Sequence, residues 1–233
     1  MSDSFGKKPE ISPGGSVIHR YGEAAWSPNR TGSPDPSTAK FAETRHAVYA
    51  ALFGEVREVF EEARPLIPRI EVRSYFRRGK DGSEVCSLVT SGMSDLRMKA
   101  PAGADALRTE LILYCTEPKP EYVETMRWLA HFPHDQNTWI GYGHTIPNGD
   151  PPAPFWGSRI LDTILLMPPI VAKDQALPDQ LALDGDPVHF LWLAPLTTAE
   201  CKLKLARGFE AILDLFQTNR HPHVFDPNRA SYV

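Results

Sequence analysis

The stretch that decides the fold is residues 85–96, with the sequence VCSLVTSGMSDL. The apolar run from Val85 to Thr90 is typical of a buried strand. Gly92 can adopt a positive φ at no steric cost, and Ser94 or Asp95 can hydrogen-bond the local backbone, so we expect a turn directly after the strand. Such a turn places polar side chains at the edge of a sheet, where sites are often found. The same residues also suit an ordinary capped turn.

Further strands are predicted on both sides of this turn. Residues 70–78 alternate between apolar and polar side chains, as in a half-exposed strand, and Gly79–Gly82 is typical of the hairpin turn that leads to 85–90. Strands are also predicted over 107–116, 160–170 and 188–196, with a short one within 139–146.

Three helices are predicted, over residues 39–63, 120–131 and 197–217. In the first, charged residues that include Arg45 form a solvated face, and Pro65 ends the helix. Pro120 suits the start of the second helix, and Thr197 or Thr198 with Glu200 resembles a helix start signal. Consecutive strands without intervening helices favour antiparallel pairing. The predicted class is therefore α+β, an α/β sandwich with a mixed, largely antiparallel sheet packed against about three helices.

Residues 1–38 are predicted to form an extended or disordered N-terminal arm. They are rich in Gly, Pro, Ser and Asn and lack apolar periodicity. Val17, Ile18, Tyr21 and Trp26 are exceptions that could dock the arm onto the body. Residues 39–233 then form a single domain.

Composition excludes several classes of partner. The net charge of -4 and the pI near 6.1 argue against a nucleic-acid backbone or a membrane surface as the main partner. No apolar run approaches the ~20 residues of a membrane span, and the N-terminus lacks a signal-peptide core, so a cytoplasmic protein is expected. Cys86, Cys115 and Cys201 each lie in an apolar segment, which favours buried, reduced thiols.

A cluster of potential metal ligands follows the second predicted helix. His131, His134, Asp135 and His144 have the spacing H-x2-H-D-x8-H, which could bring three or four ligands together. The pattern matches no standard zinc motif, and a structural role for each histidine is the alternative. A metal-dependent hydrolase that uses these four residues is thus one hypothesis for function.

Two further kinds of chemistry find weaker support. Ser91, Ser94 or Cys86 could act as a nucleophile with a histidine and Asp95, but no G-x-S-x-G elbow surrounds a serine, and Cys86 lies within a predicted core strand. The glycines of the Gly141-Tyr142-Gly143 segment precede no helix start, so no phosphate loop and no cofactor are predicted.

Aromatic residues in irregular segments favour protein recognition instead. They are Trp128, Trp139, Tyr142, Phe155 and Trp156. Aromatic side chains presented by loops are the usual hot spots of protein interfaces. The alternative is that they fill a core between long loops; this is the better interpretation for Trp128, whereas both remain open for Phe155 and Trp156.

Six segments, taken in order, resemble the suppressor of fused family. They are SGMSDL at 91–96, LRTELILY at 107–114, WLAHFPHD at 128–135, TWIGYGHTIPNG at 138–149, MPPI at 167–170 and HFLWLAPLT at 189–197. Their order and spacing cover roughly residues 45–216. The resemblance is closest to the short bacterial form of the family.

The resemblance implies a mixed α/β sandwich that is non-catalytic and works through protein–protein contact. Animal members hold a transcription factor between this domain and a second, C-terminal one, whereas short bacterial members look like immunity proteins of toxin systems. Animal members have an aromatic residue and then an acidic loop where this chain has Arg97-Met98-Lys99. Their partner-binding residues are therefore not carried over.

The sequence thus predicts a non-catalytic, cytoplasmic protein that sequesters or neutralises a protein partner, with a toxin as the expected partner. An acidic protein suits a basic partner, such as a nuclease toxin. A structural domain of a larger assembly is a further alternative. The predicted partner-binding residues are Ser94, Asp95, Arg97, His134, Asp135, Tyr142, His144 and Trp156.

Overall fold

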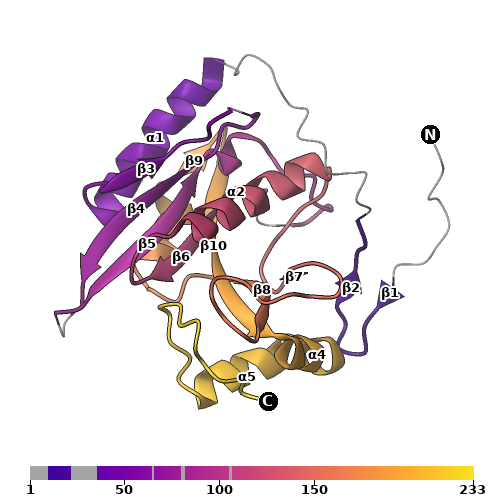
Figure 1. Ribbon diagram of the computed structural model, residues 1–233. Coiled ribbons are helices and arrows are strands. Elements are labelled where there is room, and N and C mark those ends of the chain that lie inside the picture. Colours follow the sequence, from indigo (N-terminus) through magenta and orange to yellow (C-terminus); the bar gives the residue numbers. More distant parts are fainter. Residues whose placement is uncertain (1–9, 22–35, 65, 80–81, 105–106) are drawn as a thin grey trace.

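The chain folds around a mixed sheet of eight strands in the order β3-β4-β5-β6-β10-β8-β7, with β9 paired to β10 beside this path (Figure 1). The computed structural model describes residues 10–21, 36–64, 66–79, 82–104 and 107–233. The strands of this sheet are β3 (Glu58–Phe60), β4 (Glu71–Arg78), β5 (Glu84–Ser91), β6 (Arg108–Cys115), β7 (Thr145–Pro147), β8 (Leu161–Met167), β9 (Ala182–Leu183) and β10 (Asp186–Thr197). All pairs are antiparallel except β6 and β10. The predicted α+β class is confirmed.

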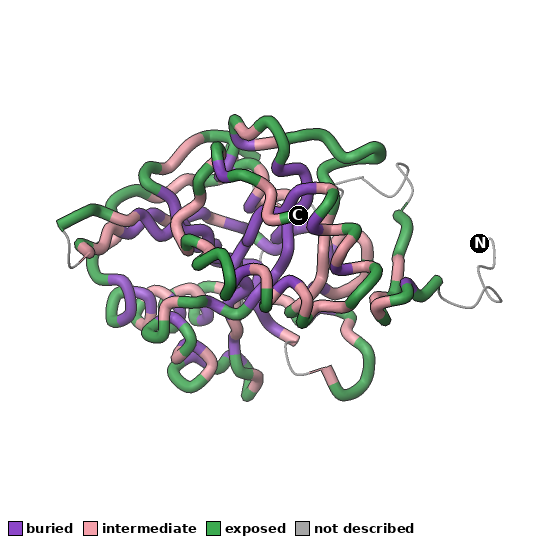
Figure 2. Tube along the Cα trace, turned by 90° about the horizontal axis from the view of Figure 1, so that it is seen from below, coloured by how far each residue is buried: buried purple, intermediate pink, exposed green. Residues whose placement is uncertain are grey.

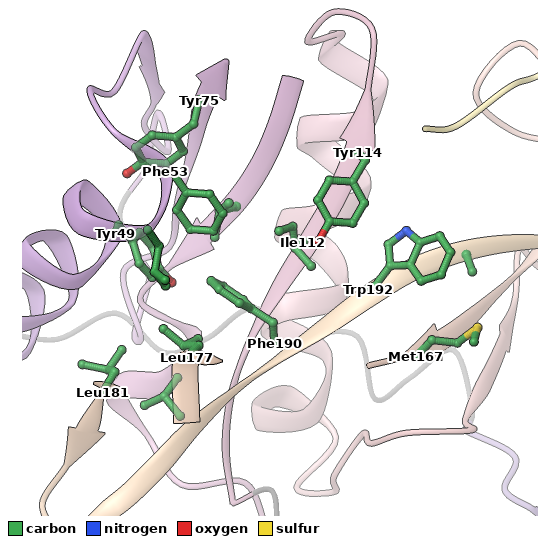
Figure 3. Close-up of a cluster of buried hydrophobic side chains, with 14 of the residues drawn as sticks. Tyr49, Phe53, Tyr75, Ile112, Tyr114, Met167, Leu177, Leu181, Phe190 and Trp192 are labelled. Carbon is green, nitrogen blue, oxygen red and sulfur yellow. The ribbon is translucent and has the colours of Figure 1, made fainter. Parts of the chain in front are cut away.

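Helices cover both faces of the sheet. They are α1 (Pro36–Phe53), α2 (Pro120–Asp135), α3 (Leu177–Gln180), α4 (Thr198–Arg207) and α5 (Glu210–Thr218). One core, beneath α2, contains Leu88, Leu111 and Met126. The other, in Figure 3, gathers Tyr49 from α1, Leu177 from α3 and Phe190 and Trp192 from β10. Because β6 and β10 are covered on both faces, the buried chain runs through the middle of the molecule (Figure 2).

The first predicted helix is wrong at its C-terminal end. The helix ends at Phe53, because Gly54 adopts a left-handed φ of 89° and donates its N–H to the carbonyl of Ala50 at 2.9 Å. The predicted final turns instead contain strand β3, which pairs with β4. The predicted last helix begins as expected, with Thr197 and Glu200 forming a capping box, but it is divided into α4 and α5 at Gly208 (φ 92°).

The second helix is longer than predicted. It continues through Pro133 to Asp135, so residues 132–135, which were predicted to be irregular, are helical. Pro133 deletes only the hydrogen bond that its own N–H would make to Leu129, and Gln136 resumes the pattern by donating to the carbonyl of Phe132 at 2.9 Å. The short strand expected within 139–146 lies at Thr145–Pro147.

Residues 10–21, within the predicted N-terminal arm, form a small hairpin of β1 (Glu10–Ile11) and β2 (Val17–Ile18). The hairpin contacts α4, because the N–H of Gly14 donates to the carbonyl of Leu205 at 2.7 Å. Trp26 lies outside the described residues. None of the helices in the described parts of the chain combines the length and the apolar character that crossing a membrane requires.

The C-terminal segment is held to the domain by a buried ion pair. Arg229 donates to both carboxylate oxygens of Glu200, at 2.8 and 2.6 Å, and to the carbonyl of Pro195 at 2.7 Å. Burial opposes the charge of Glu200, but Arg229 and backbone N–H groups outweigh it and lower the pKa of this carboxyl.

We expect the substitution Arg229→Met to destabilise the protein by about 3–5 kcal/mol, since Glu200, with 0% of its side chain exposed, would lose its counter-charge. Urea unfolding at pH 7 measures this loss. The control is Arg207→Met, which removes a positive charge from the exposed last turn of α4 and should cost less than about 0.5 kcal/mol. Equal losses in the two variants would show that the buried pair is not what holds the segment.

Candidate functional site

The turn after β5 depends on Gly92. This residue has a φ of 127°, and a Cβ at its position would lie 1.9 Å from the carbonyl oxygen of Arg69. The chain then forms one 3-10 turn, Met93–Asp95, in which the N–H of Asp95 donates to the carbonyl of Gly92 at 3.1 Å. The predicted positive φ is confirmed, and the close approach of another backbone adds a second reason for glycine.

The carboxylate of Glu110, on β6, organises this turn from inside. Its Oε1 accepts from the N–H of Gly92 at 2.9 Å, the N–H of Ser94 at 3.0 Å and the hydroxyl of Ser94 at 2.6 Å. Its Oε2 accepts from the hydroxyl of Thr90 at 2.7 Å. Glu110 is fully buried, so the turn wraps around a charge that is out of contact with water.

Arg45, on α1, supplies the opposite charge. Its Nε donates to the Ser91 hydroxyl at 2.9 Å and its Nη1 to Asp95 Oδ1 at 2.6 Å, while Nε lies 3.6 Å from Glu110 Oε1. Burial alone would lower the pKa of Arg45, but the carboxylates of Glu110 and Asp95 outweigh it and raise that pKa. Burial raises the pKa of Asp95 to about 6, although Arg45 acts in the opposite direction.

Sequence reasoning missed Arg45 by placing it on a solvated face. Only 2% of the residue is exposed. The sequence did contain a sign that Arg45 is buried. Phe41, Arg45 and Tyr49 are spaced by four residues, so Arg45 lies on the same side of the helix as two aromatic residues. Glu110 carried a similar signal, because it is a charged residue directly before the apolar run 111–115 of a strand.

Two more polar side chains, Arg108 and His134, contact the turn. Arg108 donates from Nη1 to the carbonyls of Ser94 and Asp95, at 2.7 and 2.8 Å, and from Nε to Asp186 at 3.1 Å. His134, at the end of α2, hydrogen-bonds the carbonyl of Met93 through Nε2 at 3.1 Å. Elements α1, α2 and β6 therefore all contact the same short turn, and β10 is linked to it through Arg108.

This geometry leaves no exposed nucleophile in the turn. Ser94 is fully buried and donates to Glu110. Ser91 lies 3.0 Å from Nε2 of His46, but only 2% of the serine is exposed and its oxygen already accepts from Arg45. Cys86 is buried opposite Cys115 on β6. None of the three nucleophile candidates is therefore placed to attack a substrate.

The predicted metal cluster is not formed. His131 bonds Glu62, His134 bonds a carbonyl, and His144 packs edge-on against Trp139 with ring centroids 4.4 Å apart. Within the described ranges, no three His, Cys, Asp or Glu side chains are grouped so that they could share a metal ion.

Of the eight predicted partner-binding residues, Arg97 and Tyr142 are the most exposed. Arg97 pairs with Asp186, donating from Nη2 to Oδ1 at 2.7 Å, and 56% of its side chain is exposed. Tyr142 is 41% exposed and its hydroxyl lies 3.5 Å from Nδ1 of His189. Both residues thus contact the first half of β10, although Asp186 and His189 point to opposite faces of the sheet.

The other predicted residues are buried or lie elsewhere. Ser94, Asp95 and His134 belong to the buried turn, and Asp135 is half-buried at the end of α2. Trp156 is 4% exposed and donates its indole N–H to Thr125 at 3.0 Å, near the start of α2. Burial lowers the pKa of His144 to about 4, with a further effect from Lys204. That these residues contact a partner stays a prediction.

Residues 68–230 match the family model described as suppressor of fused protein. The chain belongs to the suppressor of fused family. A comparison with curated protein sequences found no significant match.

Solved structures of family members share the fold. A suppressor of fused homologue from Neisseria gonorrhoeae FA 1090 is 20% identical, with a TM-score of 0.62, and the match covers 84% of this chain and 98% of that one. The suppressor of fused chain of the Sufu–Fu complex is 10% identical, with a TM-score of 0.58 over 86% and 93% of the two chains. Drosophila Suppressor of Fused is 11% identical, with a TM-score of 0.53 over 86% of this chain and 54% of that one.

Three of the six segments that carry the family resemblance meet at the turn. The segment 91–96 forms it, 107–114 supplies Glu110 and Arg108, and 128–135 supplies His134. A fourth, 138–149, is attached nearby, since the N–H of Lys99 donates to the carbonyl of Thr138 at 3.1 Å. Four of the six segments therefore lie at this buried polar cluster or are attached beside it.

We expect Gly92→Ala to destabilise the protein by about 3 kcal/mol or more, because the new Cβ would meet the Arg69 backbone. Gly103→Ala is the matched control: Gly103 has a φ of 86°, but a Cβ added there would have no neighbouring atom within 4 Å, so only the backbone strain of about 1 kcal/mol is expected. Thermal and urea unfolding of both variants measure the difference. Similar losses would mean that the contact with Arg69 is unimportant.

His46 makes stability depend on pH at this site. Burial, with Arg73 and Arg45 nearby, lowers its pKa to about 4 from an ordinary value of 6.5. A histidine whose pKa is lowered by folding stabilises the protein above its unfolded pKa, and this stabilisation is lost as the pH falls from about 6.5 to 4. Asp95, with its pKa raised, has the opposite effect between about pH 6 and 4.

His46→Gln should therefore flatten the acid side of the stability profile. Relative to pH 7, wild type at pH 4.5 should lose about 1 kcal/mol more than the variant, a value reduced to allow for the partial exposure of His46. Urea unfolding at the two pH values gives the comparison, with exposed His19→Gln as the control. An unchanged profile in His46→Gln would contradict this assignment.

Proposed function

We propose that this chain is a non-catalytic protein-binding domain that sequesters or neutralises a protein partner in the cytoplasm, as an immunity protein against a toxin. The observation that carries the proposal is the state of the turn at 91–96. Its serine and aspartate side chains are buried and bonded to Arg45 of α1 or Glu110 of β6, so they maintain a shape rather than perform chemistry. Residues 39–233 are proposed to act as one domain, with 1–38 as its arm.

The solved relatives support binding as the mode of action. One of them is described as the Sufu–Fu complex, so at least one protein with this fold has been crystallised with a protein partner. In this chain, we place the contact surface around the start of β10, where Arg97 and Tyr142 are exposed. Ser94, Asp95 and His134 then fix the loop from which Arg97 projects.

The charge of the chain favours a basic partner. Net charge is -4, and the start of β10 is flanked by the exposed carboxylates of Asp179 on α3 and Asp184 in the β9–β10 turn. We call these two residues the acidic rim. Opposite charge on the two proteins accelerates association, an effect that salt suppresses. A nuclease toxin, which must itself bind nucleic acid, has the required positive surface.

Rescue of growth tests this function. The chain is co-expressed with any toxin that a neighbouring gene encodes, and the purified pair is then studied by surface plasmon resonance. We expect growth to be restored and a complex to form. Absence of rescue, together with no protein captured by the purified chain, would contradict the proposal.

The acidic rim gives a sharper prediction. The double variant Asp179→Asn/Asp184→Asn should slow association with a basic partner several-fold at 50 mM salt and have little effect at 500 mM. The matched control is Glu210→Gln/Asp214→Asn, which removes two exposed carboxylates from α5. An equal effect of the two double variants would show that only net charge matters and that the start of β10 is not the contact surface.

A further inference from the structure

The hairpin at residues 10–21 lies on the body with its polar side inwards. Ser12 is buried and Ser16 is half-buried, whereas the register partners Ile11 and Val17 are 61% and 47% exposed. A hairpin that formed part of a core would place such an apolar pair inwards. Burial of apolar area therefore contributes little to the docking of this hairpin, which lies at the edge of the molecule beside α4 (Figure 1).

Backbone contacts hold the hairpin instead. The N–H of Gly14 donates to the carbonyl of Leu205 at 2.7 Å. A Cβ added to Gly14 would lie 2.7 Å from the carbonyl oxygen of Lys204 and would also meet the backbone nitrogen of Gly208, so this position requires glycine. The turn of the hairpin is thus fitted closely to the last turn of α4.

Aromatic and imidazole side chains of the body lie beside and under the hairpin. The ring of Tyr21 packs edge-on against Phe132, with ring centroids 5.1 Å apart. Burial lowers the pKa of His144 to about 4, and Lys204 and His19 add to this effect, which places both of them near the imidazole. Two of the segments that carry the family resemblance therefore meet the hairpin, one through Phe132 and one through His144.

Lys204 has an unusual environment beneath the hairpin. Only 3% of the residue is exposed, and its Nζ donates to the hydroxyl of Ser16 at 3.2 Å. No carboxylate of a described residue forms an ion pair with it, and burial lowers its pKa despite the opposing effect of Cys201. A buried ammonium whose partner is a neutral hydroxyl is incompletely compensated. A carboxylate at the position of Ser16 would compensate it better.

These side chains continue the contact surface proposed above. The N–H of His144 donates to the carbonyl of Gly141 at 3.1 Å, so His144 and the exposed Tyr142 belong to one tight turn. A protein in contact with Tyr142 is therefore close to the hairpin as well. The covered surface, as we call it, comprises Phe132, Trp139, His144 and Lys204.

We propose that the hairpin is a strap over the covered surface, and that a turn of small residues with one carboxylate, carried by the protein partner, takes its place beside Lys204. This inference rests on the proposed function and adds the chemistry of the contact. The net charge of a basic partner governs its approach, whereas Lys204 selects a single acidic side chain at the surface. Because few contacts hold the strap, a partner segment has little to displace.

Acetylation of lysines in the purified full chain, followed by mass spectrometry, tests the strap. Lys202, exposed on the same helix, is the internal reference. In wild type, Lys204 should react at least tenfold more slowly than Lys202. Gly14→Ala, which prevents docking of the hairpin, should bring the two rates within threefold. Gly15→Asn is the control and should leave Lys204 protected, because a Cβ there meets no atom within 4 Å and asparagine tolerates a φ of 83°.

A second variant tests the carboxylate while the hairpin stays in place. Ser16→Asp gives the ammonium of Lys204 a counter-charge, so acetylation of Lys204 should slow at least a further threefold. Val17→Asp introduces the same charge at an exposed neighbouring position and should leave the rate unchanged within twofold.

A peptide probe tests what the covered surface binds. Residues 10–21 are synthesised with Ser16→Asp or with Ser16→Asn, which has nearly the same shape and no charge. The Gly14→Ala chain, whose own hairpin is undocked, should bind the Ser16→Asp peptide at least tenfold more tightly than the Ser16→Asn peptide. Calorimetry at 50 mM salt measures both affinities.

Several results would overturn the strap proposal. They are equal acetylation of Lys204 and Lys202 in wild type, continued protection of Lys204 in Gly14→Ala, no difference between Ser16→Asp and Val17→Asp, and equal or absent binding of the two peptides.

The immunity function and the strap can fail separately. If the expected acetylation and peptide results are obtained and toxin rescue fails, only the immunity function is overturned. With a toxin that is neutralised, Gly14→Ala should tighten the complex and Ser16→Asp should weaken it, each severalfold by surface plasmon resonance. A complex that neither variant affects would overturn only the strap as a competitor of the partner.

Discussion

The buried charge cluster at the end of β5 is the constraint on which the arrangement of this domain depends. Arg45 from α1 and Glu110 from β6 meet across the turn that contains Gly92 and Asp95. Each charge removed from water needs its counter-charge within a few ångströms, because an unpaired one costs several kcal/mol. The helix, the strand and the turn can therefore adopt only the relative positions at which all four groups meet. Apolar packing alone would allow more freedom.

The same pairing of buried polar groups explains why the cluster is not arranged as a hydrolytic site. Serine, histidine, aspartate and glutamate close together are the usual components of a hydrolytic site. Here every one of them is an internal partner of another: Ser91 accepts from Arg45, and Ser94 donates to Glu110. Catalytic groups must reach a substrate, whereas these two serines are buried against their partners. Burial and hydrogen bonding, rather than residue type, separate a structural polar cluster from an active site.

Much of the fold could be predicted from local patterns in the sequence. Alternation located β4, the apolar runs located β5, β8 and β10, and the Thr197–Glu200 capping box located the start of α4. Local patterns gave wrong predictions where contacts between distant parts of the chain determine the structure, as at the end of α1 and at Arg45. Gly54 fits both a weak point inside a helix and the end of a helix, and the pairing of 58–60 with β4 favours the end. Arg45 was assigned to solvent because its partners lie 50 and 65 residues further along the chain, at Asp95 and Glu110.

For the candidate site, sequence reasoning could find the turn but not the gap in strand pairing beside β10. This gap exists because β8 stops pairing at Met167 and β9 starts at Ala182, while β10 continues between them. A long apolar strand such as β10 looks uniform in sequence, yet its pairing changes along its length. Residues 188–192 pair with β6 and residues 192–197 pair with β8, so residue 192 has a strand partner on both sides, whereas 189–191 have one on a single side. Pairing is a property of neighbours. A break in the pairing of a strand therefore leaves no motif in the residues of that strand.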